Sequence, residues 1–297
     1  LAGLALGKGD HEEQLAKSEA IVAEGHRVFP QVTPRPLNFE YQMAAPFLFE
    51  PFSVMKPAAA ADAEGKKKIY ADPEFREAFR ARIDGARKEF KGAFDKTVIS
   101  QHKKNGGLDE KVLADVARER GMTPTDLLLD LALETDLETR FRMPVANHNE
   151  DEVEPLLKSG ATVIGLSDAG AHASQLCDAC QPTYFLGRWV REKQTFTIEE
   201  AVRMLTSRPA EVAGITDRGL LAEGRPADIA VFDPETVGAG GLERVYDFPG
   251  GADRLISKER GMRAVVVNGT VLRENGADAI SPEGNLPGGV LRNGRAA

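Results

Sequence analysis

One aspartate lies where α/β proteins carry their chemistry. Asp168 follows the apolar run 161–166, and Gly170 and His172 come shortly after it. A continuous apolar run is typical of a strand covered on both faces, and α/β barrels hold their reacting groups just beyond the carboxyl ends of such strands. Asp followed by Ala-Gly is also common in turns and helix caps. On spacing alone, a turn or cap is the favoured interpretation of Asp168.

Three other polar side chains are candidates for contact with a substrate. His172 either contacts a substrate or the nearby aspartate, or makes an ordinary loop hydrogen bond. Arg35 has a guanidinium group that suits a substrate carboxylate, although a solvated loop arginine is the commoner case. His148 follows a candidate strand over 141–146 and could face a barrel mouth, but a helix cap at Asn149 is the favoured use of that segment.

The two cysteines form a Cys-x-x-Cys pair, Cys177 and Cys180. A structural zinc site needs four ligands, and the sequence has no second cysteine pair to complete one. The surrounding pattern also lacks the strand and helix order of a thioredoxin-like redox motif. We therefore expect two reduced, partly buried thiols.

Helices and strands alternate before the candidate site. The patterns predict helices over 10–25, 73–83, 109–119, 124–134 and 150–158, and strands over 28–32, 141–146 and 161–166. Strand, helix and strand in succession over 141–166 favour a parallel sheet with helical crossovers. Residues 37–71 have no clean period, and we interpret them as a long loop with short helical turns.

The pattern changes towards the carboxyl end. Thr197 and Glu200 form a capping box in front of a further helix. A strand over 227–234 and a hairpin over 264–272, with Asn-Gly at its turn, indicate a small β unit. The Gly- and Pro-rich tail is expected to be poorly ordered.

Composition excludes several kinds of partner. The chain has 297 residues, 42% of them hydrophobic, which is enough for a large core. Its net charge of -8 makes nucleic acid and anionic membranes poor partners. No apolar stretch of ~18 residues and no signal-peptide pattern occur, so we expect a soluble, cytoplasmic protein. The chain starts at Leu1 without a cap or turn signal, as if cut within a fold.

Three segments resemble the carboxyl-terminal portion of amidohydrolases, and more narrowly the N-acyl-D-amino-acid deacylase (D-aminoacylase) group. They are residues 164–172, residues 200–211 with their continuation over 217–228, and Val267-Asn268-Gly269. Residues 29–36 also look like a segment of this group.

The resemblance implies a fold and its divisions. The expected fold is α/β, a partial TIM-like (β/α) barrel of the amidohydrolase type with a small C-terminal β unit. Residues 1–218 would form the carboxyl-terminal part of the barrel, 219–275 the small β domain and 276–297 a tail.

The resemblance also implies a reaction. The family hydrolyses the amide bond of a small-molecule N-acyl-D-amino acid, using one or two zinc ions. Asp168 would bind the metal and accept a proton from the attacking water, which zinc makes more acidic. His172 and Arg35 would contact the substrate.

The family's His-x-His metal pair is absent from this sequence. Its five histidines are His11, His26, His102, His148 and His172, and the first three lie in polar segments expected to be exposed. We therefore interpret the chain as a fragment that is inactive alone. Two alternatives stay open: an amidohydrolase acting on a cyclic amide or lactone, similar to dihydropyrimidinase or hydantoinase, and a non-catalytic scaffold or binding protein.

Overall fold

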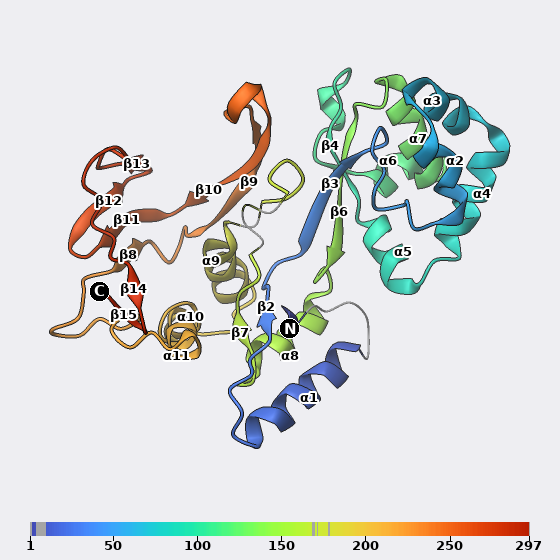
Figure 1. The fold of residues 1–297 in the computed structure, drawn as a ribbon. Helices are drawn as coiled ribbons and strands as arrows, with labels where there is room; N and C mark the ends of the chain where they lie inside the picture. The colour runs from blue at the N-terminus through green and yellow to red at the C-terminus, as the bar shows by residue number, and fades with distance from the viewer. Residues whose placement is uncertain (1, 4–9, 168–169, 171, 178, 297) are drawn as a thin grey trace. The chain divides into compact units, whose positions relative to one another are not determined.

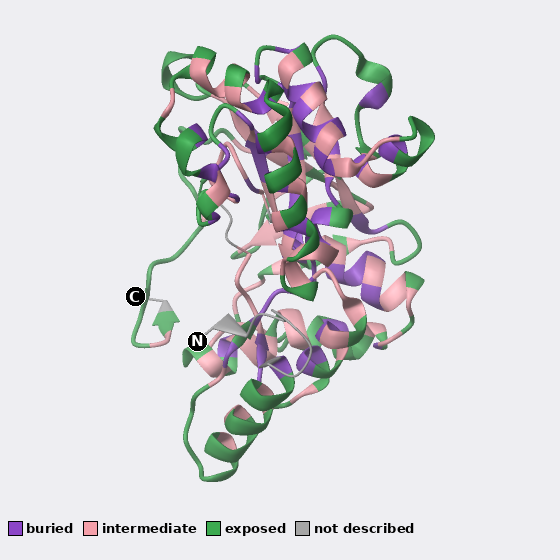
Figure 2. Ribbon diagram, turned by 90° about the vertical axis from the view of Figure 1, so that its right-hand side faces the viewer, coloured by how far each residue is buried: buried purple, intermediate pink, exposed green. Residues whose placement is uncertain are grey.

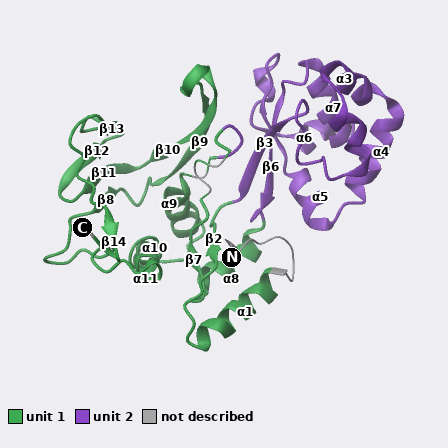
Figure 3. Ribbon diagram, viewed as in Figure 1, with its two compact units in different colours: residues 1–35, 149–173, 177–297 green, residues 36–148, 174–176 purple. Residues whose placement is uncertain are grey.

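The computed structural model describes residues 2–3, 10–167, 170, 172–177 and 179–296. The chain forms two compact units, which Figure 3 shows in different colours. The inserted unit consists of Pro36–His148 and Ser174–Leu176. The host unit consists of Leu1–Arg35, Asn149–Ala173 and Cys177–Ala297. The predicted α/β fold is confirmed, because both units combine helices with sheets.

A four-stranded antiparallel sheet runs through the inserted unit, in the order β3-β6-β4-β5. The strands are β3 (Leu37–Gln42), β4 (Val98–Gln101), β5 (Lys111–Val112) and β6 (Arg140–Ala146). β3 pairs with β6 from Leu37 opposite Ala146 to Gln42 opposite Arg140. The chain therefore enters and leaves this unit on two neighbouring antiparallel strands (Figure 1).

The inserted unit contains the three helices that the sequence predicts and several others whose positions it does not predict. They are η1 (Ser53–Met55), α2 (Lys56–Ala60), α3 (Ala63–Ala71), α4 (Pro73–Asp84), α5 (Lys88–Asp95), η2 (Gly106–Leu108), α6 (Leu113–Glu119) and α7 (Pro124–Glu134). α4 and α7 confirm two predicted helices, and the side chains of Asp72 and Thr123 cap them. The helix predicted from 109 begins later, at Leu113, because Lys111 and Val112 pair with β4.

The prediction of a long loop with short helical turns over 37–71 is wrong in part, because the short helices are present but the segment also forms a strand. This segment contains β3, η1, α2 and α3. The residues of β3, Leu-Asn-Phe-Glu-Tyr-Gln, alternate between apolar and polar as in a half-buried strand, a signal that the scattered prolines and aromatics around it obscure. Asp62 caps α3 by accepting a hydrogen bond from the Gly65 amide.

An aromatic cluster forms the core of the inserted unit. Phe49 packs edge to face against Phe79 and Tyr41, with ring centroids 5.4 Å apart in each pair, and against Phe94 at 6.2 Å. These four residues are buried. Figure 2 colours the buried positions of the chain purple. The cluster shares no residue with the host core, so the inserted unit has its own source of apolar stabilisation.

Three short parallel strands form a sheet in the host unit. β1 (Ala2–Gly3), β2 (Gln31–Val32) and β7 (Val163–Ile164) lie in the order β1-β2-β7. α1 (Asp10–Ala23) connects β1 to β2, and α8 (Glu150–Lys158) precedes β7. Parallel strands with helical crossovers are the predicted arrangement. Closure into a barrel stays a prediction.

The predicted partner of β7 is wrong. The sequence pattern pairs the strand over 141–146 with β7 in a parallel sheet, but that strand is β6 of the inserted unit and is antiparallel to β3 and β4. The parallel partner of β7 is β2, with Gln31 opposite Val163. Local alternation along the chain contains no signal that 36–148 fold separately, so it assigns neighbouring strands to one sheet.

The rest of the host unit runs from helices into β-strands. These elements are α9 (Gln181–Tyr184), the π-helix η3 (Phe185–Glu192), α10 (Ile198–Leu205), α11 (Ser207–Ala213), β8 (Ile229–Phe232), β9 (Gly238–Val245), η4 (Pro249–Gly251), β10 (Arg254–Arg260), β11 (Met262–Val267), β12 (Thr270–Glu274), β13 (Ala277–Asp278), β14 (Leu291–Arg292) and β15 (Arg295–Ala296). β13, β12, β11 and β8 form one sheet, and β9 pairs with β10.

Several C-terminal predictions are confirmed at the level of elements. The capping box at Thr197 and Glu200 begins α10, and the hairpin with Asn-Gly at its turn joins β11 to β12. The tail, in contrast, contains the β14–β15 hairpin, and Gly294 O accepts a hydrogen bond from the Thr216 amide. The domain boundaries at 218 and 275 remain predictions.

The host core is centred on Trp189. Its ring is fully buried with Phe185 and Val32, and its indole Nε1 donates a 2.6 Å hydrogen bond to Pro34 O. Within the described ranges, no helix is long and apolar enough to cross a lipid bilayer.

Because the two units have separate cores, a cavity made in one core should destabilise that unit and leave the other unchanged. Phe79→Ala should lower the free energy of unfolding of the inserted unit by about 3–5 kcal/mol, because a fully buried aromatic side chain is lost. Amide hydrogen exchange in α4 and α7 measures this loss. Fluorescence of Trp189, the one tryptophan in the sequence, reports the host unit and should keep its unfolding midpoint. Phe248→Ala, at an exposed position, is the control. An equal loss of stability in the inserted unit, measured by exchange, and in the host unit, measured by fluorescence, would contradict independent cores.

Candidate active site

The loop between β7 and α9 carries the predicted catalytic segment. β7 ends at Ile164, so the loop starts at the carboxyl end of a parallel strand, as predicted. Asp168 itself lies outside the described residues. The described part of the candidate site consists of residues on either side of it.

Two residues of this loop have left-handed backbone conformations. Leu166 has φ of 59° and His172 has φ of 46°. Such conformations cost a non-glycine residue about 1–2 kcal/mol and persist only where the surroundings hold them. They also cluster at functional sites. The loop that contains the predicted aspartate is thus under local backbone strain before and after that residue.

Hydrogen bonds hold the loop beyond His172. Ala173 O accepts a 2.8 Å bond from the Leu255 amide of β10 in the host unit. Within the inserted unit, Gln175 O accepts a 2.7 Å bond from the Glu40 amide of β3. These backbone contacts give the loop fixed attachment points.

Arg35 is buried, with 8% of its surface exposed, so its interpretation as a solvated loop arginine is wrong. Its Nη1 donates hydrogen bonds to Cys180 Sγ at 2.7 Å and to Cys177 O at 3.3 Å. Its guanidinium carbon lies 5.6 Å from the centre of the Tyr184 ring. Burial raises the pKa of Tyr184 to about 12, so this phenol stays protonated near neutral pH. Contact with a substrate carboxylate stays a prediction for Arg35.

The cysteine pair matches the expected chemical state. Cys177 and Cys180 are both free thiols, the first half-buried and the second buried. The prediction of reduced, partly buried thiols is confirmed. The sequence contained no sign that a buried arginine from another segment contacts them.

Among the other histidines, His26 is exposed as predicted, whereas two differ from the expectation. His11 and His102 are buried, at 3% exposure each, and the prediction that they are exposed is wrong. His102 follows β4, and its Nε2 lies 3.4 Å from Glu134 Oε2 at the end of α7. His148 belongs to the inserted unit, where its carbonyl accepts a 2.7 Å bond from Lys96 Nζ. The predicted cap at Asn149 is confirmed by the bond from the Asp151 amide.

The described residues do not assemble a metal site. In this part of the chain, no group of three or more His, Cys, Asp or Glu side chains is arranged to hold a metal ion. The donor set that zinc requires is therefore not provided by these residues alone.

An ion pair joins the helices on either side of the β7 loop. Both carboxylate oxygens of Glu150, at the start of α8, accept 2.8 Å hydrogen bonds from Arg188 of η3. Lys193 Nζ lies 3.3 Å from the same carboxylate. Chiefly through the Arg188 hydrogen bonds, these cations hold the pKa of Glu150 below its usual value of about 4.5.

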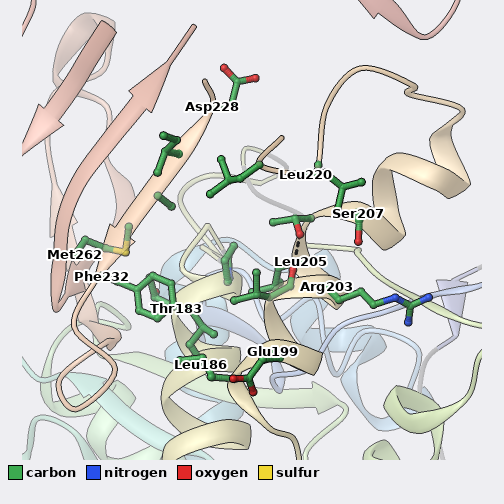
Figure 4. A pocket seen from close by; sticks show the side chains of 18 residues that line it. Thr183, Leu186, Glu199, Arg203, Leu205, Ser207, Leu220, Asp228, Phe232 and Met262 are labelled. Carbon is green, nitrogen blue, oxygen red and sulfur yellow. Dashed lines mark hydrogen bonds between the residues drawn. The ribbon is translucent and has the colours of Figure 1, made fainter. Parts of the chain in front are cut away.

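A separate apolar pocket lies between α10 and β8 of the host unit (Figure 4). Its volume is about 750 Å³, and Leu186, Leu205 and Phe232 are among its lining residues. Neither His172 nor Arg35 lines this pocket. It is therefore distinct from the described part of the candidate active site.

No local sequence pattern marks the residues that hold the start of the loop. Gln31, Gln181 and Gly165 come together there through long-range hydrogen bonds and close packing. Gln31 lies within a segment that the family resemblance singled out, but no local pattern connects it to Gln181.

The model of the amidohydrolase family matches residues 73–273. This chain belongs to the amidohydrolase family. An uncharacterized protein of Mycobacterium tuberculosis (strain H37Rv) is 31% identical over 225 residues, which cover 71% of this chain and 36% of the relative. The N-acyl-D-glutamate deacylase of Alcaligenes xylosoxydans xylosoxydans is 40% identical over 111 residues, covering 37% of this chain and 20% of that enzyme.

A solved structure also resembles this amidohydrolase chain. It is the N-acyl-D-glutamate deacylase of Bordetella bronchiseptica, complexed with zinc and a phosphonate inhibitor, with a TM-score of 0.48 and 23% identity. The match covers 91% of this chain and 45% of that structure. The chain thus spans about a third or less of the length of these two curated relatives, and less than half of the solved one.

The Glu150–Arg188 pair predicts a pH-dependent contribution to stability. Glu150→Gln should lower the free energy of unfolding at neutral pH by about 1 kcal/mol, a modest value because both side chains are partly exposed. The folded-state pKa is below the unfolded one, so the stabilisation is present above about pH 4.5 and is lost as pH falls through the folded pKa. Urea unfolding across this range measures it, with exposed Glu77→Gln as the control. A difference from wild type that grew towards acid would contradict the assignment.

Proposed function

We propose that the protein containing this chain hydrolyses the amide bond of N-acyl-D-amino acids, releasing a carboxylate and a free D-amino acid. Membership of the amidohydrolase family supports hydrolysis. The observation that carries the substrate class is the 40% identity to an enzyme named N-acyl-D-glutamate deacylase. The strained loop at the carboxyl end of β7 is the place where an α/β protein would carry such chemistry.

Asp168 is the proposed general base. A carboxylate just beyond a strand end can accept the proton of an attacking water and pass it to the leaving amine. One or two zinc ions belong to this proposal as cofactors. The described residues do not form a zinc site, however, and the sequence contains no His-x-His, so we assign no step to a metal held by this chain alone.

His172 is the stronger of the two proposed substrate contacts. It lies on the same loop as the proposed base, and its left-handed backbone is held in place by the neighbouring Ala173 bond. The Nη1 group of Arg35 already donates hydrogen bonds to Cys180 Sγ and Cys177 O within the protein. The proposal therefore assigns recognition of the small-molecule substrate first to His172.

The missing ligands predict weak metal binding by the isolated chain. In a zinc titration of the 297-residue chain, we expect no tight stoichiometric binding, and assays with N-acyl-D-glutamate should show no turnover. Tight zinc with turnover would contradict this prediction. Parallel assays with hydantoins test the cyclic-amide alternative.

Asp168→Asn tests the proposed base in the whole protein that contains this chain. We expect kcat on an N-acyl-D-amino acid to fall by about a hundredfold to ten-thousandfold, because an amide cannot accept the proton. Asp84→Asn, at an exposed position at the end of α4, is the matched control. Activity of the Asp168 variant within about threefold of wild type, well below the loss of a general base, would exclude this role.

A further inference from the structure

Two glutamine side chains bind opposite sides of one peptide group at the start of the loop. The Leu166 amide donates a 2.9 Å hydrogen bond to Gln31 Oε1. The carbonyl of the same peptide group, Gly165 O, accepts a 3.0 Å hydrogen bond from Gln181 Nε2. Both polar atoms of this peptide are therefore satisfied by side chains rather than by a neighbouring strand.

Gln31 extends the parallel sheet by one peptide. The Gly165 amide donates to Val32 O at 3.1 Å, in the β2–β7 ladder. The next amide, that of Leu166, binds the Gln31 side chain instead of a backbone carbonyl. The backbone ladder can thus stop here without leaving this amide unpaired.

Gln181 approaches from the opposite end of the loop. It is the first residue of α9 and is buried, with 4% of its surface exposed. Burying a side-chain amide without a hydrogen-bond partner costs free energy. The bond from Gln181 to Gly165 O therefore stabilises the folded loop. The bond connects the two ends of the segment that contains Asp168.

A side chain at position 165 would displace the Gln31 side chain from its present place. A Cβ on Gly165 would lie 2.5 Å from Gln31 Oε1 and 3.0 Å from its Cδ. The Gln31 side chain therefore lies directly over this residue. The following residue, Leu166, has φ of 59°, so the chain turns sharply at the peptide that the glutamines hold.

We propose that Gln31 and Gln181 are positioning residues, which fix the peptide between Gly165 and Leu166 and so set the direction in which the chain continues to Asp168. This inference rests on the proposed function, because it gives the glutamines a purpose in placing the proposed base. Their bonding roles differ: Gln31 accepts a hydrogen bond and Gln181 donates one. That difference makes the proposal testable with a single type of substitution.

Amide hydrogen exchange of the full chain, resolved by NMR, tests the hydrogen bonds directly. Gln31→Met should speed exchange of the Leu166 amide by at least about tenfold, since its acceptor is removed. The Gly165 amide, which binds Val32 O, should change by less than about threefold and is an internal control. Gln14→Met, at an exposed position of α1, is the control variant. Trp189 fluorescence verifies that the host unit is folded.

Glutamate substitutions separate the two roles. Gln31→Glu keeps an acceptor oxygen and should retain protection of the Leu166 amide. Gln181→Glu cannot donate while ionised, so it should behave like Gln181→Met and increase exchange at Leu166 as the peptide loses its fixed orientation. Equal protection of Leu166 in wild type and Gln31→Met would overturn the proposal, as would a Gln31→Glu variant that exchanges as fast as Gln31→Met.

Kinetics of the whole protein test the positioning role. With an N-acyl-D-amino acid, Gln31→Met should lower kcat by at least about tenfold while KM changes by less than about threefold, and Gln31→Glu should recover most of the loss. A changed KM with unchanged kcat would overturn the positioning role. If wild type hydrolyses no N-acyl-D-amino acid, the proposed function fails, whereas the exchange experiment still decides whether the glutamines hold this peptide.

Discussion

The parallel pairing of β2 with β7 is the constraint on which the candidate site depends. Gln31 lies opposite Val163 and Val32 opposite Ile164, although the whole inserted unit separates these strands in sequence. This pairing ends β7 beside the Gln31 side chain and starts the loop to Asp168 at the carboxyl edge of the sheet. Bringing β2 and β7 together closes a long loop, and the entropic cost of closure grows only slowly with loop length. This cost is smaller when the chain between the two strands folds by itself.

The inserted unit meets that condition through its own contacts. β3 and β6, which begin and end it, are hydrogen-bonded neighbours, so its two chain ends are held close together. Its aromatic core around Phe49 shares no residue with the host core around Trp189. In sequence, the host unit is interrupted after Arg35 and resumes at Asn149. Folding of the inserted unit and pairing of β2 with β7 are in this way compatible rather than competing.

Local signals in the sequence predict local structure well here. The caps at Asp72, Thr123 and Thr197 place α4, α7 and α10, and Asn-Gly places the β11–β12 hairpin. Such local signals do not predict which distant segments of the chain contact each other. The sequence assigns β6 to the wrong sheet, and it does not indicate that Arg35 is buried against Cys180. The place of Asp168 after an apolar run is a local signal, but the contacts of Gln31 and Gln181 with the Gly165–Leu166 peptide exist only once β2, β7 and α9 are together.

The loop is held from several directions, and this affects how substitutions in it should be interpreted. Gln31 and Gln181 hold its first peptide, Arg35 binds Cys177 O near its other end, and Glu150 joins the flanking helices through Arg188. A change at Gln31, Gln181 or Glu150 can therefore lower activity without removing a group that is proposed to touch substrate. Loss of activity alone therefore does not identify a catalytic residue. A reacting group should fail to recover with any substitute that cannot transfer a proton, whereas a positioning residue should recover with any side chain that restores its hydrogen bond.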